Sequence, residues 1–428
     1  MFTKKTVRDI DLKGKTVLMR ADYNVPVEDG EIIDDYRIKE SLPTIHYLLD
    51  QDVRLIICSH LGRPDGRVNP EESLLPVAKR LDELLGGGKV TFVRDCIGPE
   101  VDKEVGGLEP GHVLLLENLR FHPEEEADNA HFAKQLASLA EVFVQDGFAV
   151  VHRAHASTEA VTKYLPSVAG LLLEREVDTI TEAMENPKRP LMAVVGGAKI
   201  SDKIDVLHKF IDIADVVAIG GAMANTFLAA KGIDIAESLY EKDDVVIAKD
   251  IIAKAADKAR KQHFVFALPY DGVVAHKIDK LASTRIVDWS AHVIASIEDY
   301  PKRPPHAASQ IKADERILDI GPFSGSFYAG AMQLANTVVW NGSMGVTEQD
   351  GTQGPVGPYA HGTQLMVEAM LGQFGHRPFS LVGGGDTVGY VEARGLVKAF
   401  DHVSTGGGAS LELMAGRKLP GVEALQDK

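Results

Sequence analysis

Short apolar runs alternate with stretches of helical periodicity along most of the chain. Runs of this kind, without polar alternation, are typical of parallel strands that are buried on both faces. In the first half, the predicted strands are Thr16–Met19, Arg54–Cys58, Val90–Val93, Val113–Leu116 and Val142–Val144. In the second half, they are Leu191–Val195, Val216–Ile219, Phe264–Leu268, Ile317–Asp319, Val338–Trp340 and Ser380–Val382.

Segments with helical spacing of apolar residues lie between these runs. They are Leu74–Leu85, Asn129–Leu139, Leu171–Asn186, Asp202–Ile211, Met223–Lys231, Val245–Lys261 and Gln364–Phe374. Alternating strands and helices predict an α/β fold with a mainly parallel sheet. Because proline disfavours helix in the residue before it, Pro187 and Pro190 indicate a domain boundary after Leu171–Asn186. Leu411–Lys428 contains Pro420 and Gly421 and is expected to form a tail.

Composition and charge narrow the class of protein. A length of 428 residues predicts two or three domains. The formal charge of −16 argues against broad nucleic-acid binding, which needs a basic face. With two cysteines there is neither a disulfide framework nor a zinc-type spacing. The first residues are too polar for a signal peptide, and polar residues interrupt the most apolar stretch, Ala214–Ala230, so we expect no membrane span and a cytoplasmic protein.

The second half repeatedly places glycines directly after a strand, in VVGGAKISDK, AIGGAMANTF, VVWNGSMGV, LVGGGDTVGY and VSTGGGASLEL. Glycine lets the backbone turn tightly and approach a ligand, and the following helix N-terminus favours phosphate. One such turn is usually only a structural connection, but five in one half indicate a nucleotide or phosphate crevice. The chain lacks a Walker A motif, because Asp9 stands where glycine is needed before Gly14. Val388 breaks the dinucleotide fingerprint at Gly383–Val388.

Two of these turns also carry charged groups. Lys199 and Lys203 are four residues apart, so that both can face a polyphosphate, although lysine is more often simply solvated. Asp386, after Gly384 and Gly385, would repel a bare phosphate but suits a magnesium ion beside a nucleotide. In isolation, an Asp helix cap is the commoner explanation.

The first half instead ends its strands with charged groups, in RADYNVP, CSHLGRP, ENLRFHP and HRAHAST. Arginine offers a fixed fork of donors to carboxylate or phosphate. Asp22 and Asn24, in the first strand–loop junction, can bond ligand hydroxyls. A single arginine is usually a surface salt bridge, but several at successive strand ends converge on one edge of a parallel sheet. These residues are Arg37, Arg63, Arg120 and Arg153, accompanied by His60, His152 and His155.

Taken in order, these motifs resemble the phosphoglycerate kinase family over essentially the whole chain. The matching stretches are RADYNVP, DYRI, SHLGRP, ENLRF, HRAHAST, GGAKISDK, Gly220–Leu228, VWNGSMGV, GGGDT and STGGGASLEL. The resemblance implies two similar-sized α/β domains of Rossmann-like type. Residues 1–172 would bind phosphoglycerate, 173–189 would form a hinge helix, 190–411 would bind the nucleotide, and 412–428 would return to the first domain.

The resemblance also implies the reaction and its residues. The reaction would be reversible transfer between 1,3-bisphosphoglycerate with ADP and 3-phosphoglycerate with ATP, carried out by a monomer with Mg²⁺. Phosphoglycerate would be held by Asp22, Asn24, Arg37, His60, Arg63, Arg120 and Arg153. The residues that would bind the nucleotide are Lys199, Lys203, Gly321, Glu348, Gly384, Gly385, Asp386 and Thr387, and Asp386 would face the metal ion.

Several positions depart from the family pattern. The usual WNGPMGVFE reads WNGSMGVTE, so that Ser343 and Thr347 replace proline and phenylalanine in a loop expected near the nucleotide. Ala229 occupies the position where many members have a phosphate-contacting lysine, and Lys231 follows two residues later. The familiar DAFGTAHRAH reads DGFAVVHRAH.

For the mechanism, we expect direct in-line attack by an ADP oxygen on the acyl phosphate after the domains close. Arg37, Lys203, Mg²⁺ and the helix N-terminus near Gly384 would stabilise the transferring group. No general base is required, because the attacking oxygen is already ionised. Two alternatives are a nucleotide-dependent dehydrogenase, disfavoured by the missing fingerprint, and a non-catalytic binding protein, disfavoured because the main phosphate-binding positions are filled.

Overall fold

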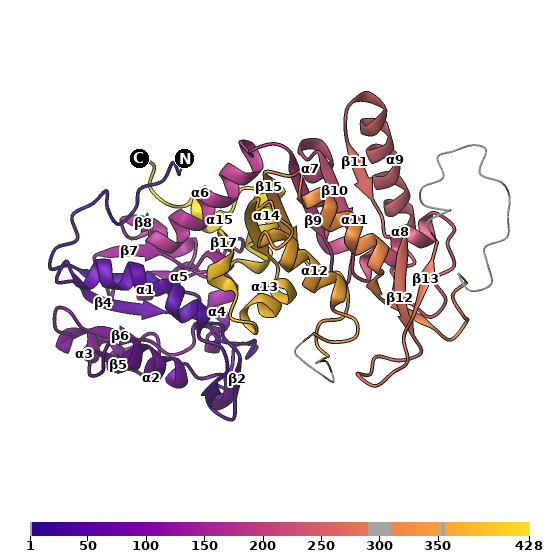
Figure 1. Ribbon diagram of the computed structural model, residues 1–428. Coiled ribbons are helices and arrows are strands. Elements are labelled where there is room, and N and C mark those ends of the chain that lie inside the picture. Colours follow the sequence, from indigo (N-terminus) through magenta and orange to yellow (C-terminus); the bar gives the residue numbers. More distant parts are fainter. Residues whose placement is uncertain (1, 290–309, 350, 352–355) are drawn as a thin grey trace. The chain divides into compact units, whose positions relative to one another are not determined.

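The computed structural model describes residues 2–289, 310–349, 351 and 356–428. Contacts within the chain divide it into two compact units. Unit 1 contains Met1–Thr179 and Arg417–Lys428, and unit 2 contains Ile180–Gly416. Each unit contains a six-stranded parallel sheet flanked by helices, which confirms the α/β fold class (Figure 1). The roles expected for residues 1–172 and 190–411 stay predictions.

The sheet of unit 1 has the strand order β5-β6-β4-β1-β7-β8. Its strands are β1 (Thr16–Arg20), β4 (Arg54–Cys58), β5 (Val90–Phe92), β6 (Val113–Leu115), β7 (Val142–Gln145) and β8 (Ser167–Ala169). On one side of β1 lie β4, β6 and β5, and on the other lie β7 and β8, which follow later in the chain, so the direction of winding reverses between β1 and β7. In open α/β sheets, ligands bind at the carboxyl ends of the strands at such a switch point.

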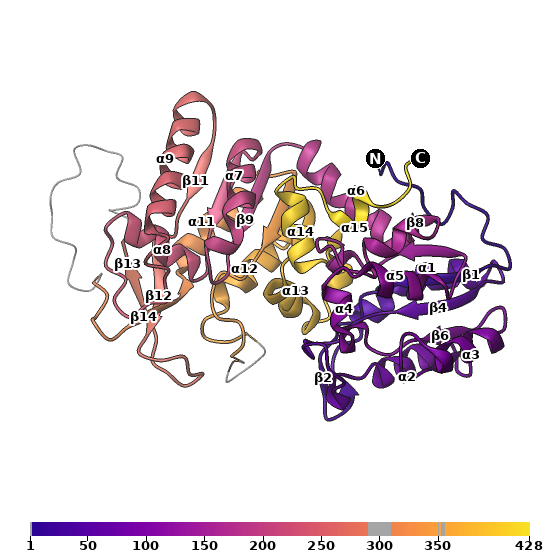
Figure 2. The same cartoon turned by 180° about the vertical axis from the view of Figure 1, so that it is seen from behind.

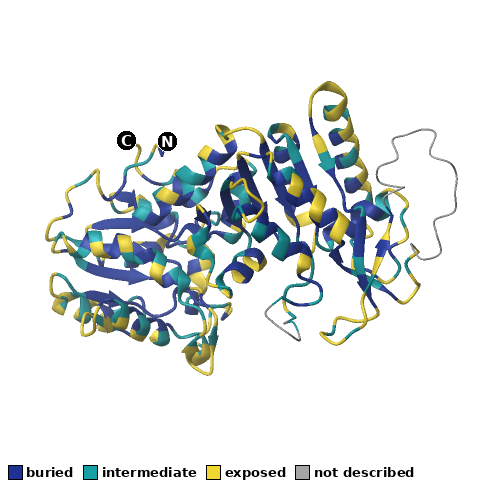
Figure 3. Cartoon of the chain, in the orientation of Figure 1, coloured by how far each residue is buried: buried dark blue, intermediate teal, exposed yellow. Residues whose placement is uncertain are grey.

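Helices cover both faces of this sheet, as the buried apolar strands predict. Residues such as Val17 and Leu55 pack toward α1 (Tyr36–Leu49) and α2 (Leu75–Leu84), while their neighbours Leu18 and Ile56 pack toward α3 (Pro99–Gly107) and α5 (Ala130–Ala137). This alternation is the two-residue period of a strand with both faces in a core. The strands are accordingly dark blue, meaning buried, in Figure 3. Unit 1 also contains β2 (Val27–Glu28), β3 (Glu31–Ile32), α4 (Pro123–Glu126) and α15 (Pro420–Glu423).

The large sheet of unit 2 has the order β11-β10-β9-β15-β16-β17, with its switch point beside β9. Its strands are β9 (Leu191–Val195), β10 (Val216–Ile219), β11 (Val265–Ala267), β15 (Thr337–Asn341), β16 (Phe379–Gly383) and β17 (His402–Val403). One face packs against α11 (Pro322–Met332), α12 (His361–Met370) and α13 (Gly385–Glu392). On β9 and β16 the sheet also contacts α7 (Ile204–Ile213) and α14 (Gly407–Met414), which are visible in Figure 2.

A second, antiparallel sheet in unit 2 is not predicted by the sequence pattern. It contains β12 (Asp271–Ala275), β13 (Arg285–Asp288) and β14 (Arg316–Ile320) in the order β13-β12-β14. The predicted strand Ile317–Asp319 therefore exists, but it pairs antiparallel with β12. Among its described residues, unit 2 also contains α8 (Met223–Ala230) and α9 (Val245–Lys261).

The predicted helices differ from the observed ones mainly at their ends. Val245–Lys261 is correct, and Leu171–Asn186 is α6 (Leu171–Glu185), within which the boundary between the units falls. Gln364–Phe374 is wrong in its position, because α12 begins at His361 and ends at Met370.

The expected C-terminal tail, Leu411–Lys428, includes helical structure, and its last part, Arg417–Lys428, belongs to unit 1. It holds the end of α14 and all of α15, and within unit 1 Gly421 N donates to Val151 O. Among the described residues, no helix is long and apolar enough to cross a membrane.

Candidate active site

In unit 1, a fully buried arginine organises the groups that follow the central strands. Arg20 ends β1, and its side chain donates to Ser157 Oγ (2.8 Å), to His60 Nδ1 (3.1 Å) and to Ala21 O. Arg20 belongs to the RADYNVP motif but is not among the site residues predicted from the sequence. Its position at the last residue of an apolar strand is a signal that could have found it. It acts here as a buried positive charge behind the site residues.

Asp22, Arg37 and His60 lie close together, and Arg20 contacts this group through His60. Arg37 pairs with Asp22 Oδ2, and His60 Nδ1 lies 3.8 Å from Asp22 Oδ1. Burial, together with Arg20 and Arg120, holds the pKa of His60 well below its usual value. His60 is therefore neutral near pH 7, and because its Nδ1 accepts from Arg20, its Nε2–H can donate a hydrogen bond to a ligand. Arg37 is the more exposed partner, with 31 % of its side chain accessible, so its guanidinium is available to a ligand.

Arg120 and Arg153 extend this cluster of positive charge. Arg120 is buried, donates to Gly62 O (2.8 Å) and pairs with Glu126 (3.1 Å). Arg153 is half-buried and lies close enough to Arg120 and His155 to lower the pKa of both groups. Burial and these arginines lower the pKa of His155 to about 4, so it is neutral as well.

Asn24 and Arg63 are attached to the same region through one loop. Asn24 Oδ1 accepts a hydrogen bond from Gly62 N (2.9 Å), and Gly62 O is the acceptor for Arg120. Arg63 follows in the chain, its backbone N donates to Glu72 Oε1 (2.7 Å), and its side chain is exposed. The structure thus gathers Asp22, Arg37, His60 and Arg120 closely, and it places Asn24, in the loop after β1, beside the loop after β4 that contains Arg63. The cluster thus gathers positive charge locally in an acidic protein, an arrangement that favours an anion.

In unit 2, glycines after β9, β10 and β15 allow three backbone turns to touch. Gly197 N donates to Ser343 O (3.0 Å), and Gly221 N donates to Met344 O (2.9 Å). A Cβ atom on Gly221 would lie 2.5 Å from Gly197 N and 2.8 Å from Ser343 O, so no larger residue fits without backbone movement. These glycines are required for close backbone approach, as the repeated strand–glycine pattern predicts.

Lys203 lies where these turns meet, and it is buried. Its Nζ donates to Gly196 O (2.6 Å), directly after β9, and to Asn341 O (3.1 Å), at the end of the neighbouring β15. Burial lowers the pKa of Lys203 to about 8, while Asp386 and Asp202 act in the opposite direction. Lys199 is exposed, so the two lysines of the GGAKISDK motif have different environments.

The N-terminus of α13 carries the other predicted phosphate-binding group. Gly384 caps this helix with a φ of 89°, a left-handed conformation that favours glycine. Gly385 and Asp386 are exposed in its first turn, while Thr387 is buried and its Oγ1 accepts a hydrogen bond from Gly342 N (2.7 Å). Thr387 therefore fastens α13 to the turn after β15, and Asp386 remains accessible.

A cavity of about 570 Å³ in unit 2 connects several of these groups. Gly197, Ser343, Glu348 and Asp386 lie in its wall. Gly321 caps α11 beside Asp271 and lines a separate cavity of about 600 Å³, so the structure does not bring it together with the others. The cavity wall also includes residues that were not predicted from the sequence as site residues, namely Asn225, Leu239, Trp289 and Asp319.

Comparisons with known proteins agree on one family. The model of the protein family described as phosphoglycerate kinase matches residues 7–417 of the chain. The chain belongs to the phosphoglycerate kinase family. It is 47% identical over 427 residues to the phosphoglycerate kinase of Moorella thermoacetica and 46% identical over 428 residues to that of Chloroflexus aurantiacus, in each case covering 100% of both chains.

Solved structures agree with this assignment. The phosphoglycerate kinase of Coxiella burnetii matches with a TM-score of 0.79 and 35% identity, covering 98% of both chains. That of Pyrococcus horikoshii matches with a TM-score of 0.80 and 29% identity, covering 99% of this chain and 98% of the other. The predicted family and reaction are confirmed: the chain is a phosphotransferase with phosphoglycerate kinase activity.

Two departures from the pattern of the phosphoglycerate kinase family can be placed in the structure. Ala229 is half-buried and packs against the apolar cluster around Leu228 and Trp289, while Lys231 is exposed just after the end of α8. The part of α8 that lines the cavity is Ala224, Asn225 and Leu228. Ser343 is buried in the cavity wall, and Thr347 N donates to Glu348 Oε2 (3.1 Å).

Proposed function

We propose that the cluster in unit 1 binds 3-phosphoglycerate and 1,3-bisphosphoglycerate. Arg37, Arg63, Arg120 and Arg153 supply forked donors for the phosphate and carboxylate oxygens. Asp22 and Asn24 provide oxygen acceptors for the hydroxyl group of the three-carbon acid. His60 is neutral, so it contributes a hydrogen bond to the ligand rather than a charge. The buried Arg20 supports this proposal, because it adds positive charge while fixing His60 in place.

We propose that the cavity in unit 2 binds ATP or ADP. Lys203, Lys199 and the N-terminus of α13 at Gly384, Gly385 and Thr387 would meet the phosphates. Glu348, exposed at the cavity wall, would accept hydrogen bonds from the ribose hydroxyls. Gly321 is proposed to lie near the bound nucleotide, although it lines the neighbouring cavity in this structure.

Asp386 fits a magnesium ion, because it is an exposed carboxylate in the cavity wall and magnesium prefers oxygen ligands. When bound, Mg²⁺ would neutralise charge on the nucleotide phosphates. Lys203 would hold its positive charge toward the same phosphates from the buried side. The remaining contribution of the chain is positioning and electrostatic stabilisation, which dominate phosphoryl transfer.

We propose that, in one direction of the reversible reaction, the phosphoryl group passes directly and in line from the acyl phosphate to an oxygen of ADP. Reacting atoms must come within about 3.5 Å, so the ligands of the two units must be brought together during the cycle. No side chain is needed to remove a proton, because the attacking phosphate oxygen is ionised. The lowered pKa values of His60 and His155 agree with this assignment, since neither is poised near pH 7. The chain is further proposed to act as a monomer in the cytoplasm.

The observation that best supports these assignments is that each unit gathers groups suited to binding phosphate beside the switch point of its own parallel sheet. The direct test is an assay that couples ADP formation to a recorded signal, with 3-phosphoglycerate and MgATP as substrates. We expect ADP formation that depends on both substrates and is lost without Mg²⁺. ADP formation that ignores 3-phosphoglycerate would contradict the assignment. An absorbance change with a nicotinamide cofactor would favour the dehydrogenase alternative.

A further inference from the structure

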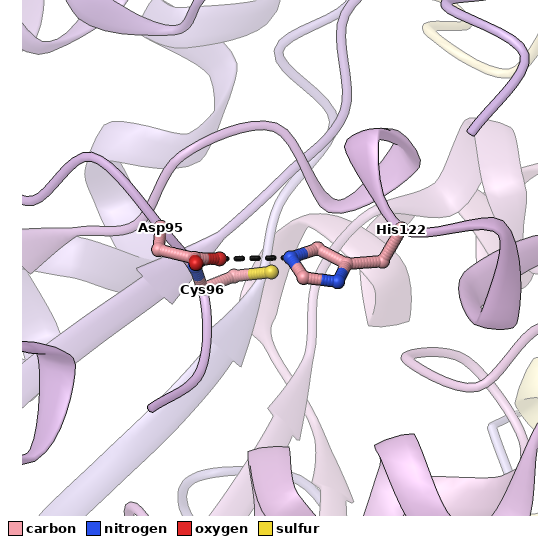
Figure 4. A group of neighbouring side chains, drawn as sticks. All are labelled: Asp95, Cys96 and His122. Carbon is pink, nitrogen blue, oxygen red and sulfur yellow. Dashed lines mark hydrogen bonds and ion pairs between the residues drawn. The ribbon is translucent and has the colours of Figure 1, made fainter. Parts of the chain in front are cut away.

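Three potential metal ligands converge in unit 1 on a point that the proposed reaction does not use. Asp95 and Cys96 follow β5, and His122 follows the 3-10 helix η2 (Leu119–Phe121) after β6. Because β5 and β6 are parallel neighbours, both loops leave the same edge of the sheet. One donor atom from each residue lies within 4.8 Å of the other two. Figure 4 shows the carboxylate and the thiol directed at the same side of the imidazole ring.

The arrangement is held in place by ordinary packing and hydrogen bonds. Cys96 is fully buried, and its backbone N donates to Asp95 Oδ1 (2.7 Å). The ring of His122 stacks on Phe132, with 5.2 Å between ring centroids, and its Nε2 lies 2.8 Å from Asp95 Oδ1. Asp95 and His122 remain 46% and 26% exposed, so an ion can reach the group from solvent.

Thiolate, imidazole and carboxylate together are the donors that zinc takes in proteins, whereas magnesium and calcium take oxygen. We propose that Asp95, Cys96 and His122 bind one zinc-like divalent cation, with water completing its coordination. On binding, the thiol proton passes to solvent, and the neutral His122 ring presents an unprotonated Nε2 to the cation while its one proton lies on Nδ1. In a tetrahedral zinc site, the oxygen and nitrogen ligand atoms lie about 3.3 Å apart. The exposed carboxylate of Asp95, now 2.8 Å from His122 Nε2, must therefore move about 0.5 Å away from that nitrogen.

The groups around Cys96 favour a bound cation at this point rather than a role for Cys96 as a nucleophile. The carboxyl groups of Asp95, Glu125 and Glu117 lie close enough to act electrostatically on Cys96, which is itself fully buried. Their negative field favours a cation beside the sulfur. In a catalytic triad, the carboxylate and the nucleophile use opposite nitrogens of the imidazole, unlike the arrangement in Figure 4. The sequence shows no zinc-type spacing because the ligands come from two separate loops.

The test uses the full chain, stripped of metal and free of nucleotide, titrated with Co²⁺ as a spectroscopic probe for zinc. We expect one equivalent of Co²⁺ to produce a thiolate-to-cobalt charge-transfer band and the visible bands of a four-coordinate site. Zn²⁺ should abolish both sets of bands by displacement. Cys96→Ser should remove the charge-transfer band, and Asp95→Asn and His122→Gln should each weaken Co²⁺ binding at least tenfold.

Matched controls separate this site from general effects of substitution. Cys58→Ser removes the other buried cysteine of unit 1, and His131→Gln removes an exposed histidine on the nearby α5; both variants should bind Co²⁺ like the parent. Asp95→Asn and His122→Gln change partly exposed residues, so they test the site even if Cys96→Ser fails to fold. The proposal is overturned if the parent shows no charge-transfer band, if the band survives Cys96→Ser, or if Cys58→Ser also abolishes it.

Discussion

Lys203 shows how one residue can combine a structural and a chemical role. Its Nζ joins the ends of β9 and β15, yet it also lies under the strand–glycine turns proposed to hold nucleotide phosphates. Burying an ammonium group is costly, which is why its pKa falls to about 8. The sequence could predict that this lysine faces phosphate. It could not predict the burial, because that depends on the turn after β15, more than a hundred residues away.

The lowered pKa of Lys203 predicts a pH dependence of nucleotide binding. Above pH about 8 the side chain loses its charge, so MgATP affinity of the free enzyme should fall by up to about tenfold per pH unit. Below that pH the ammonium is charged and the affinity should be constant. The measurement is a titration of MgATP between pH about 6.5 and about 9.5. In Lys203→Met the affinity should be low and independent of pH over this range; the same pH dependence in the variant would assign it to another group.

At the scale of elements, the sequence predicts only part of how the glycine turns of unit 2 pack against one another. The glycines themselves are visible in the sequence, and strand–glycine–helix units predict a crevice. Which glycine touches which neighbour depends on strand order, which the sequence pattern does not specify. The antiparallel sheet β13-β12-β14 was missed for a similar reason, since short strands give the same pattern in either direction.

Gly342→Ala tests the fit of these turns. Gly342 has a φ of 97°, and a Cβ atom would lie 2.5 Å from Lys203 Nζ and closer still to Gly196 O. We expect a loss of about 1–3 kcal/mol in the free energy of unfolding together with weaker MgATP binding. Gly330→Ala is the control, because Gly330 lies in α11 with open space around it and should become slightly more stable. Equal urea unfolding curves for Gly342→Ala and the parent would show that the turn tolerates a side chain.

The N-terminus of α6 carries a second element-scale prediction. Asp146 Oδ1 accepts hydrogen bonds from Leu172 N (3.0 Å) and Leu173 N (3.2 Å), and burial raises the pKa of Asp146 to about 7. The folded chain therefore holds one more proton at this group than the unfolded chain between pH about 4 and about 7. The resulting contribution to the free energy of unfolding is largest near pH about 4, decreases as the pH rises, and is lost above pH about 7.

Asp146→Asn should remove this pH dependence while keeping an oxygen acceptor for both N–H groups. The free energy of unfolding of the parent, relative to this variant, should fall by at most about 1.4 kcal/mol per pH unit between pH about 4 and about 7. Urea unfolding at a series of pH values measures the difference. A difference that stays constant with pH would show that Asp146 is ionised in the folded chain throughout.

At the scale of the whole molecule, the sequence predicted more of the function than of the architecture. Charged groups after strands in one half and glycines after strands in the other were enough to indicate two kinds of binding site. Arg20, the separate position of Gly321 and the convergence of Asp95 and Cys96 with His122 needed the fold, because they depend on contacts between distant segments. A periodic pattern contains no information about such contacts.

The central claim is that each unit binds a different substrate, and crossed binding titrations of two variants test it most directly. The dissociation constants of 3-phosphoglycerate and of MgATP are measured by calorimetry for Arg37→Ala and for Lys203→Met. We expect Arg37→Ala to weaken 3-phosphoglycerate binding by at least about tenfold, the loss of one charge-assisted hydrogen bond, and to leave MgATP within about twofold. Lys203→Met should do the reverse. If Arg37→Ala weakens MgATP, or Lys203→Met weakens only 3-phosphoglycerate, the division of substrates between the units is contradicted.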